Sequence, residues 1–139
     1  MKKCASIYTL TTCFRNVIRD FPYEMQSSAF GDLFLWSLLG DYGKGKFLEN
    51  IKPSRYRVHS GGVFSQQSKK TKFLMSSKTN SALFLYYSRI KNEELSDYFF
   101  EENMIATIRV YGFFSMLKRF SEYYFNIIKS KLMILKIVK

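Results

Sequence analysis

The stretch that decides the predicted fold is Gly31–Ser65, GDLFLWSLLGDYGKGKFLENIKPSRYRVHSGGVFS. Its first residues carry apolar side chains at helical spacing, which predicts a helix. The apolar stripe consists of Leu33, Trp36 and Leu39, with Leu35 and Leu38 beside it. Asp32 lies at the expected start of this helix, where the helix dipole favours a carboxylate. Gly40 and Gly43 are expected to end the helix.

The segments on both sides of this helix are predicted from residue type and spacing. Strands are expected at Ala5–Phe14, Lys44–Asn50 and Ser54–His59, and a helix at Ser68–Ile90. The stripe predicted for this helix, at i, i+3, i+4 spacing, consists of Phe73, Leu74, Ser77, Ser81, Phe84, Leu85 and Ser88. Another helix is expected to begin at Ser96–Phe100, and either a single amphipathic helix or two helices broken near Gly112 are expected to run to the end of the chain. One helix and three short strands cannot cover both faces of a sheet. The predicted fold class is therefore α/β, as an incomplete domain followed by C-terminal helices.

Three blocks of sequence carry a resemblance to a known family. They are TLTTCFRN (Thr9–Asn16), FGD (Phe30–Asp32) and YRVHSGGVFS (Tyr56–Ser65). In this order and at these separations they resemble the second half of the catalytic domain of family 2 glycosyltransferases of the GT-A type. The resemblance implies that residues 1–92 are the C-terminal, acceptor-side portion of a Rossmann-like GT-A domain, and that residues 93–139 are a helical extension.

The resemblance also implies an activity and a missing partner segment. Family 2 enzymes of this kind transfer a sugar, with inversion, from a nucleotide-diphosphate sugar to a hydroxyl of a glycan or lipid-linked acceptor, as in the synthesis of cell-envelope polysaccharide. Their nucleotide-binding half carries an Asp-x-Asp motif, which this sequence does not contain. The chain is therefore expected to be a fragment that is inactive or nearly inactive alone.

Asp32 is the predicted catalytic residue. Inverting transfer needs a group that accepts the proton of the acceptor hydroxyl as this hydroxyl attacks the anomeric carbon, and a carboxylate at the mouth of a sugar pocket can do so. The resemblance implies this role for Asp32. The alternative is an ordinary helix cap, because Asp is a preferred residue there. Trp36, four residues later, is interpreted as a core residue in preference to a platform for stacking a sugar.

His59 is the predicted metal ligand, again by resemblance. Imidazole can complete an oxygen-rich site around Mn²⁺ or Mg²⁺, which would offset the charge of the donor diphosphate. Arg57 lies on the same side of the expected strand as His59, and the backbone amides of Gly61 and Gly62 could fold over phosphate. Arg57, Gly61 and Gly62 are the predicted diphosphate-binding group. The alternative for His59 is an ordinary surface or core histidine.

The charge of the chain supports a second hypothesis of another class. The net charge is +11, with nine basic and no acidic residues from Lys52 to Lys91, and seven basic residues against one acid from Met104 to Lys139. A small basic module that binds nucleic acid or anionic membrane without catalysis is therefore the alternative function. The basic residues follow no recognisable nucleic-acid motif, so nucleic acid is not an expected partner of the glycosyltransferase.

The tail at residues 120–139 is predicted to be a basic amphipathic helix. Its apolar stripe consists of Phe120, Tyr123, Tyr124, Ile127, Ile128, Leu132, Leu135 and Val138, and Lys118, Lys129, Lys136 and Lys139 lie off it. Such a helix can lie on an anionic bilayer, or it can pack on the domain or on a partner helix. The first of these would give the chain peripheral contact with the inner face of the plasma membrane.

The predicted location is cytoplasmic. Cys4 and Cys13 would lie roughly 30 Å apart on one strand, too far to bridge, and are interpreted as small buried residues in a reducing compartment. The residues after Lys3 are too polar for a signal-peptide core, and the sequence has no run of roughly eighteen apolar residues.

Overall fold

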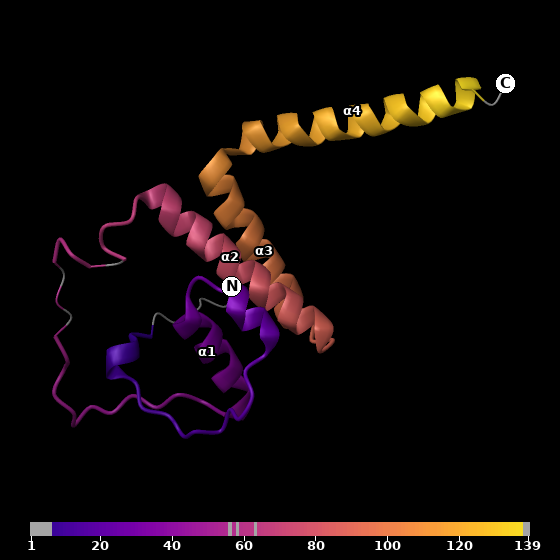
Figure 1. The fold of residues 1–139 in the computed structure, drawn as a ribbon. Helices are drawn as coiled ribbons and strands as arrows, with labels where there is room; N and C mark the ends of the chain where they lie inside the picture. The colour runs from indigo at the N-terminus through magenta and orange to yellow at the C-terminus, as the bar shows by residue number, and fades with distance from the viewer. Residues whose placement is uncertain (1–6, 56, 58, 63, 138–139) are drawn as a thin grey trace.

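The computed structural model describes residues 7–55, 57, 59–62 and 64–137, with the side chains of the last helix described as far as Lys129. This part of the chain is helical. The α-helices are α1 (Gly31–Leu39), α2 (Lys69–Arg89), α3 (Glu93–Tyr111) and α4 (Phe113–Ile137), and the short 3-10 helices are η1 (Thr9–Thr11), η2 (Tyr23–Ser27) and η3 (Gly40–Tyr42). Figure 1 shows α2 and α3 side by side, with α1 beneath them and α4 extending away.

The prediction of an α/β, Rossmann-like fold is wrong, because the described residues contain no β-strand. The described part of Ala5–Phe14 holds η1 and extended chain, and Lys44–Asn50 is irregular and exposed. In the segment Ser54–His59, Tyr56 and Val58 lie outside the described residues, and the other four residues of the segment are irregular. Cys4 also lies outside the described residues. A strand needs a neighbour to pair its N–H and C=O groups. None of the described segments provides one, so β-favouring residue types alone do not make a strand here.

The framework of the molecule is an antiparallel pair of helices, α2 and α3. Each begins with a side-chain cap: Ser68 Oγ accepts from the N–H of Thr71 at 3.1 Å, and Asn92 Oδ1 accepts from the N–H of Leu95 at 3.2 Å. The turn between them is tight, with Lys91 at a φ of 60° and the N–H of Asn92 donating to Tyr87 O at 2.9 Å. The predicted boundary at residue 92 falls in this turn.

Small polar side chains let α2 and α3 approach closely. Ser77 Oγ donates to Asn103 Oδ1 at 2.6 Å, and the hydroxyls of Ser88 and Ser96 lie 2.7 Å apart. Both serines of α2 belong to the stripe predicted for this helix, but the fully buried positions of α2 are others, including Leu83 and Tyr87. Leu74 and Leu85, predicted on the stripe, are exposed.

Tyr87 is the centre of the core. Its ring stacks on Phe99 of α3, with ring centroids 5.6 Å apart and an interplanar angle of 6°, and its hydroxyl lies 2.8 Å from Ser37 Oγ of α1. Burial raises the pKa of Tyr87 to about 12. Phe34 and Leu38 of α1 are buried in the same core. The buried residues of α1 are therefore Phe34 and Leu38. Phe34 comes one position after Leu33 of the predicted stripe, and Leu38 comes one position before Leu39.

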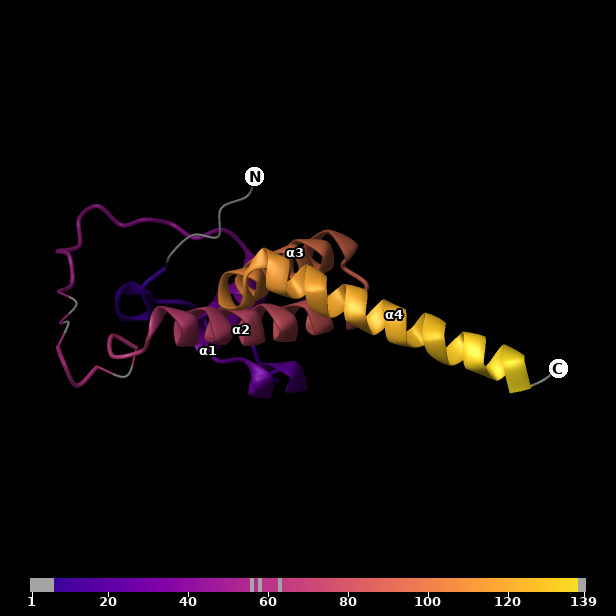
Figure 2. The ribbon, with the colours of Figure 1, turned by 90° about the horizontal axis from the view of Figure 1, so that it is seen from above.

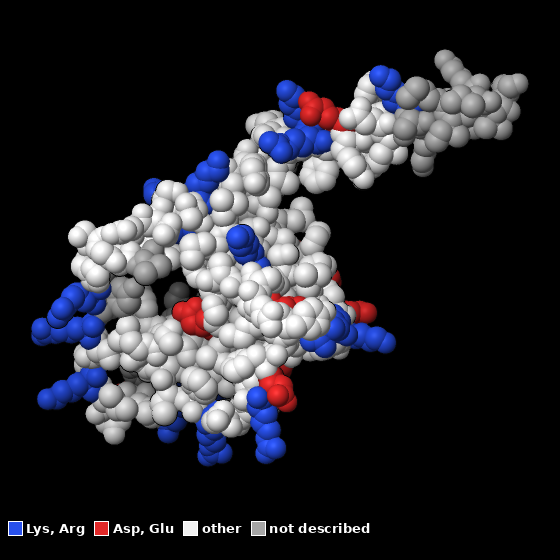
Figure 3. Space-filling model, viewed as in Figure 1, with Lys and Arg blue, Asp and Glu red and all other residues white. Residues whose placement is uncertain are grey.

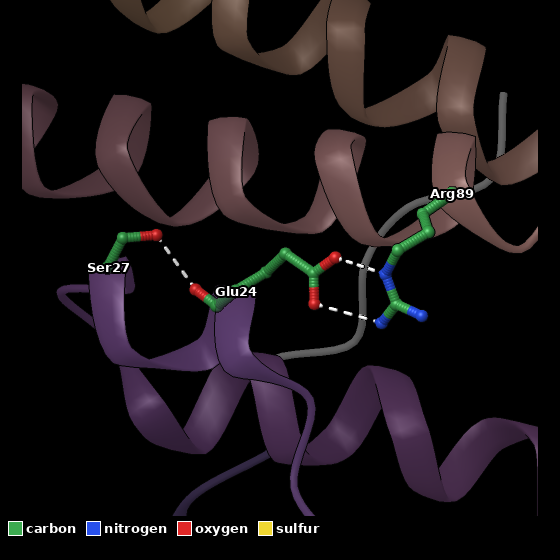
Figure 4. A network of polar contacts seen from close by, with 3 residues as sticks. All are labelled: Glu24, Ser27 and Arg89. Atoms are coloured by element: carbon green, nitrogen blue, oxygen red, sulfur yellow. Dashed lines mark hydrogen bonds and ion pairs between the residues drawn. The ribbon is translucent and has the colours of Figure 1, made fainter.

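A buried carboxylate fastens η2 to the end of α2 (Figure 4). Arg89 donates two hydrogen bonds to Glu24, from Nε to Oε1 at 2.6 Å and from Nη2 to Oε2 at 3.0 Å, and Ser27 Oγ donates to Glu24 O at 2.8 Å. The carboxylate is almost fully buried, whereas the guanidinium is half exposed and lies over the rings of Tyr23 and Tyr86. The hydrogen bonds from Arg89 hold the pKa of Glu24 below its ordinary value.

The end of the chain leaves the body as a separate helix. Gly112, at a φ of 81°, breaks the helical run between α3 and α4, which is the second of the two arrangements expected here. Figures 1 and 2 both show α4 projecting from the body along most of its length. Within the described residues, no helix combines the length and apolar character needed to cross a membrane. Cys13 is exposed, contrary to the prediction of a buried thiol.

The Glu24–Arg89 pair predicts a pH dependence of stability. Because the folded pKa of Glu24 is lowered, the pair's contribution is complete above the ordinary glutamate value of about 4.3 and is lost as the pH falls through the lower, folded value. Glu24→Gln is expected to lower the free energy of unfolding by about 1–3 kcal/mol at neutral pH, with a smaller difference in acid. Urea unfolding, followed by circular dichroism across this pH range, measures both effects.

The matched control is Glu49→Gln, which changes an exposed carboxylate in the irregular segment after α1. It is expected to change the free energy of unfolding by less than about 0.5 kcal/mol. A difference between wild type and Glu24→Gln that stays constant down to the acid end of the range would contradict the account of this ion pair.

Candidate functional site

Asp32 lies in the first turn of α1 and is exposed. Phe30 is the N-cap residue and makes no side-chain cap, so Asp32 is not the cap of this helix. Its Oδ2 accepts from Thr9 Oγ1 at 3.1 Å, and its Oδ1 accepts from the N–H of Leu33 at 2.8 Å. A carboxylate offers about four lone-pair sites, so both oxygens can accept further hydrogen bonds. The structure thus places a solvent-facing carboxylate, with spare accepting capacity, at a helix N-terminus.

Thr79 of α2 determines where α1 begins. Its Oγ1, fully buried, accepts from the N–H of Phe30 at 2.9 Å and from Ser28 Oγ at 3.2 Å. The N–H of Phe30 precedes the helix and has no intrahelical partner, so a side chain must satisfy it when it is buried. The same contact holds Asp32, two residues later, in place against the α2–α3 pair.

A cleft of about 320 Å³ lies beside Asp32. Three helices form its walls, and its polar residues supply two carboxylates, a guanidinium, two hydroxyls and an amide. They are Asp32 of α1, Ser76 and Asn80 of α2, and Tyr98, Glu102 and Arg109 of α3. Trp36, Phe73 and Phe99 supply apolar surface. The volume is at the lower end of the range for small-molecule sites.

Trp36 is partly buried and lines the cleft. Phe14 packs against its ring edge to face, with centroids 5.8 Å apart. Its Nε1 is buried and has no hydrogen-bond partner among the described residues. Trp36 is not among the residues of the described core cluster, so the predicted core role is not observed.

The cleft residues of α2 and α3 were not predicted from the sequence. Ser76 and Asn80 are four residues apart, and Glu102 and Arg109 are seven apart, so each pair lies on one helix face. This spacing of polar residues within otherwise apolar stripes is a signal that could have been noticed. It does not reveal that both pairs face Asp32, because that follows from how the helices pack.

His59 lies in a turn that is closed on itself. The N–H of Gly61 donates to His59 Nδ1 at 3.1 Å, and the N–H of Gly62 donates to His59 O at 3.1 Å. Ser65 Oγ also donates to His59 O, at 3.2 Å. The two amides predicted to cover phosphate are therefore already used within the turn. Arg57 and His59 are both exposed.

The described residues do not fit a metal site. Among them, no three His, Cys, Asp or Glu side chains gather as a possible ligand set. His59 by itself offers one ring nitrogen, since its Nδ1 accepts from Gly61, and Mn²⁺ or Mg²⁺ needs several oxygen ligands. The predicted metal ligand would need carboxylates that this group of residues does not supply.

The end of the block Tyr56–Ser65 lies against the start of α1. Phe64 packs edge to face against Phe30, with ring centroids 5.7 Å apart, and Lys72 Nζ lies 4.6 Å from the Phe64 centroid. Together with the hydrogen bond from Thr9 to Asp32, this brings one residue from each of the other two resembling blocks to the second block, Phe30–Asp32. Comparisons with known protein families, curated proteins and solved structures found no match.

The role of Thr79 leads to a prediction for stability. Thr79→Val keeps the shape of the side chain but removes the acceptor of the buried N–H of Phe30. The free energy of unfolding is expected to fall by about 1–3 kcal/mol, the usual cost of an unsatisfied buried donor. Thermal and urea unfolding measure the change. Thr12→Val, which removes an exposed hydrogen bond to Tyr8 O, is the control and is expected within about 0.5 kcal/mol of wild type. Equal effects of the two variants would contradict the role of Thr79.

Proposed function

We propose that this chain forms the acceptor side of an inverting sugar transferase in which Asp32 is the catalytic base. The reaction moves a sugar from a nucleotide-diphosphate sugar to a hydroxyl of a glycan or lipid-linked acceptor. One observation carries the proposal: the three blocks that resemble family 2 glycosyltransferases meet at Phe30–Asp32, through Thr9 on one side and Phe64 on the other. Blocks that serve one site are expected to meet in space, and these contacts join residues that are 23 or more positions apart in the sequence.

The cleft beside Asp32 supports a carbohydrate acceptor. A sugar presents hydroxyl groups around an apolar ring face, and the cleft offers the matching groups on three helices. Glu102 can accept hydrogen bonds from hydroxyls, and Asn80 can accept or donate them. Arg109 can donate to ring or hydroxyl oxygens, and Trp36 supplies an aromatic surface. This arrangement suits a neutral, polyhydroxylated ligand better than an anion, because carboxylates outnumber the guanidinium.

On the acceptor side of the site, the chemical step requires only one group that accepts a proton. The acceptor hydroxyl oxygen attacks the anomeric carbon of the donor, and its proton passes to a carboxylate oxygen of Asp32. The bond from the anomeric carbon to the diphosphate breaks, and the nucleoside diphosphate leaves with the bonding electrons. The hydrogen bonds from Thr9 and Leu33 fix the carboxylate without using all its lone pairs.

The donor side needs groups from another polypeptide segment. The sequence contains no Asp-x-Asp, and the amides of Gly61 and Gly62 donate within their own turn. Arg57 and His59, both exposed, are the residues of the third block that could face a donor diphosphate. The chain alone is therefore expected to give no turnover. A location at the cytoplasmic face of the plasma membrane is part of the same proposal.

The proposal predicts that Asp32→Asn abolishes most of the activity of the assembled enzyme. The variant keeps the size of the side chain and removes the base, so turnover is expected to fall by about 10²-fold or more, with little change in donor affinity. The measurement is transfer from a panel of labelled nucleotide sugars, using enzyme prepared from its natural source with the chain in its native assembly.

The matched control is Asp41→Asn, in the short 3-10 helix η3 that directly follows α1, where the carboxylate is also exposed. It is expected to keep near-normal turnover. Equal turnover of wild type and Asp32→Asn would assign Asp32 to helix stability alone and refute its role as base.

A further inference from the structure

The described part of α4, Phe113–Lys129, is divided sharply into two faces. At about 100° of turn per residue, its polar side chains fall within an arc of about 100°. These side chains are Ser115, Lys118, Arg119, Glu122, Asn126 and Lys129. The remaining arc of about 200° is apolar and largely aromatic. Its one polar residue, Ser121, donates its hydroxyl to Lys118 O at 2.8 Å and so presents no unsatisfied group.

The apolar face of α4 is open to solvent. Phe114 is 82% exposed, Phe125 67% and Phe120 54%, and Leu117, Tyr124 and Ile128 are each about half exposed or more. Figures 1 and 2 show why, since α4 leaves the body beyond Gly112. A contiguous apolar surface of this size marks an interaction site.

The charges of α4 identify the kind of partner. From Phe113 to Lys139 the sequence has six basic residues and one acid, Glu122, which pairs with Lys118 at 3.9 Å. Lys118 and Arg119 lie at the two borders between the polar and apolar arcs, where a long side chain can extend to lipid headgroups while its stem rests on apolar surface. Figure 3 shows these basic groups around a single acidic one on the described part of the helix.

We propose that α4 binds in the plane of an anionic membrane surface, with its apolar face buried at the level of the headgroups. The width of the apolar arc favours this partner over a second copy of the chain, because a seam between two helices needs a narrower stripe. The positive borders and the aromatic content match a negatively charged interface. The inference stands apart from the catalytic proposal, since it uses none of the residues of the cleft.

The test measures partition of the full chain into lipid vesicles by co-sedimentation. The vesicles contain either phosphatidylcholine alone or equal parts of phosphatidylcholine and phosphatidylglycerol. Binding is expected to the anionic vesicles, to be at least about 10-fold weaker on the neutral ones, and to weaken at high salt. Lack of binding to the anionic vesicles would overturn the proposal.

Two pairs of variants separate the apolar contribution from the charges. Phe120→Ser is expected to weaken partition by about 10-fold or more, because an aromatic side chain no longer enters the lipid. Asn126→Ser, a change at an exposed position on the polar face, is expected to have less than about a twofold effect. Lys118→Gln and Lys129→Gln should each weaken binding to anionic vesicles by about fivefold and leave the neutral ones unaffected.

Other occupants of the face give different results. If α4 pairs with a second copy, sedimentation equilibrium shows an association that Phe120→Ser abolishes, and the anionic vesicles bind no better than the neutral ones. That result, or equal losses from Phe120→Ser and Asn126→Ser, overturns the proposal. Circular dichroism of each variant checks that the helices are retained.

Discussion

The fold depends on one buried tyrosine that joins its own helix to two others. Tyr87 belongs to α2, stacks on Phe99 of α3 and hydrogen-bonds Ser37 of α1. Eight residues earlier on α2, Thr79 holds the N–H of Phe30, just before α1 begins. Eight residues span about 12 Å of helix, close to the distance from Phe30 to Ser37 along α1. Helix α1 is therefore tied to α2 near both of its ends and runs in the same direction.

This double attachment connects the fold to the candidate site. With both ends held, the carboxylate of Asp32 has a fixed position at the mouth of the cleft, and the opposite wall of the cleft is α3, which Tyr87 also orders through Phe99. A functional group is most effective when packing and hydrogen bonds hold its supporting residues. The hydrogen bond from Thr9 and the ring contact of Phe64 add the other two sequence blocks to the same position.

Local features of the fold were predictable, because they depend on nearby residues. The helix predicted at Ser68–Ile90 is observed at Lys69–Arg89, and the helix start at Asp32 is confirmed. Of the two arrangements expected near the end of the chain, the one broken at Gly112 is observed. The predicted strands were wrong, because forming a strand depends on a partner strand elsewhere in the chain. The buried face of α1 was misplaced because its sequence, LFLWSLL, is apolar almost all round. Glu102 and Arg109 entered the cleft only through the packing of α3, which spacing within one helix does not reveal.

The central claim is that a carbohydrate acceptor binds in the cleft beside Asp32, and the single tryptophan of the chain is its natural reporter. Trp36 lines the cleft, and its indole N–H has no partner in the described residues. Titration of the chain with oligosaccharides, followed by the indole ¹H–¹⁵N resonance and tryptophan fluorescence, tests the claim most directly. The account predicts a saturable shift of both signals that Arg109→Ala weakens. Saturable binding of an oligosaccharide that leaves both Trp36 signals unchanged would contradict it.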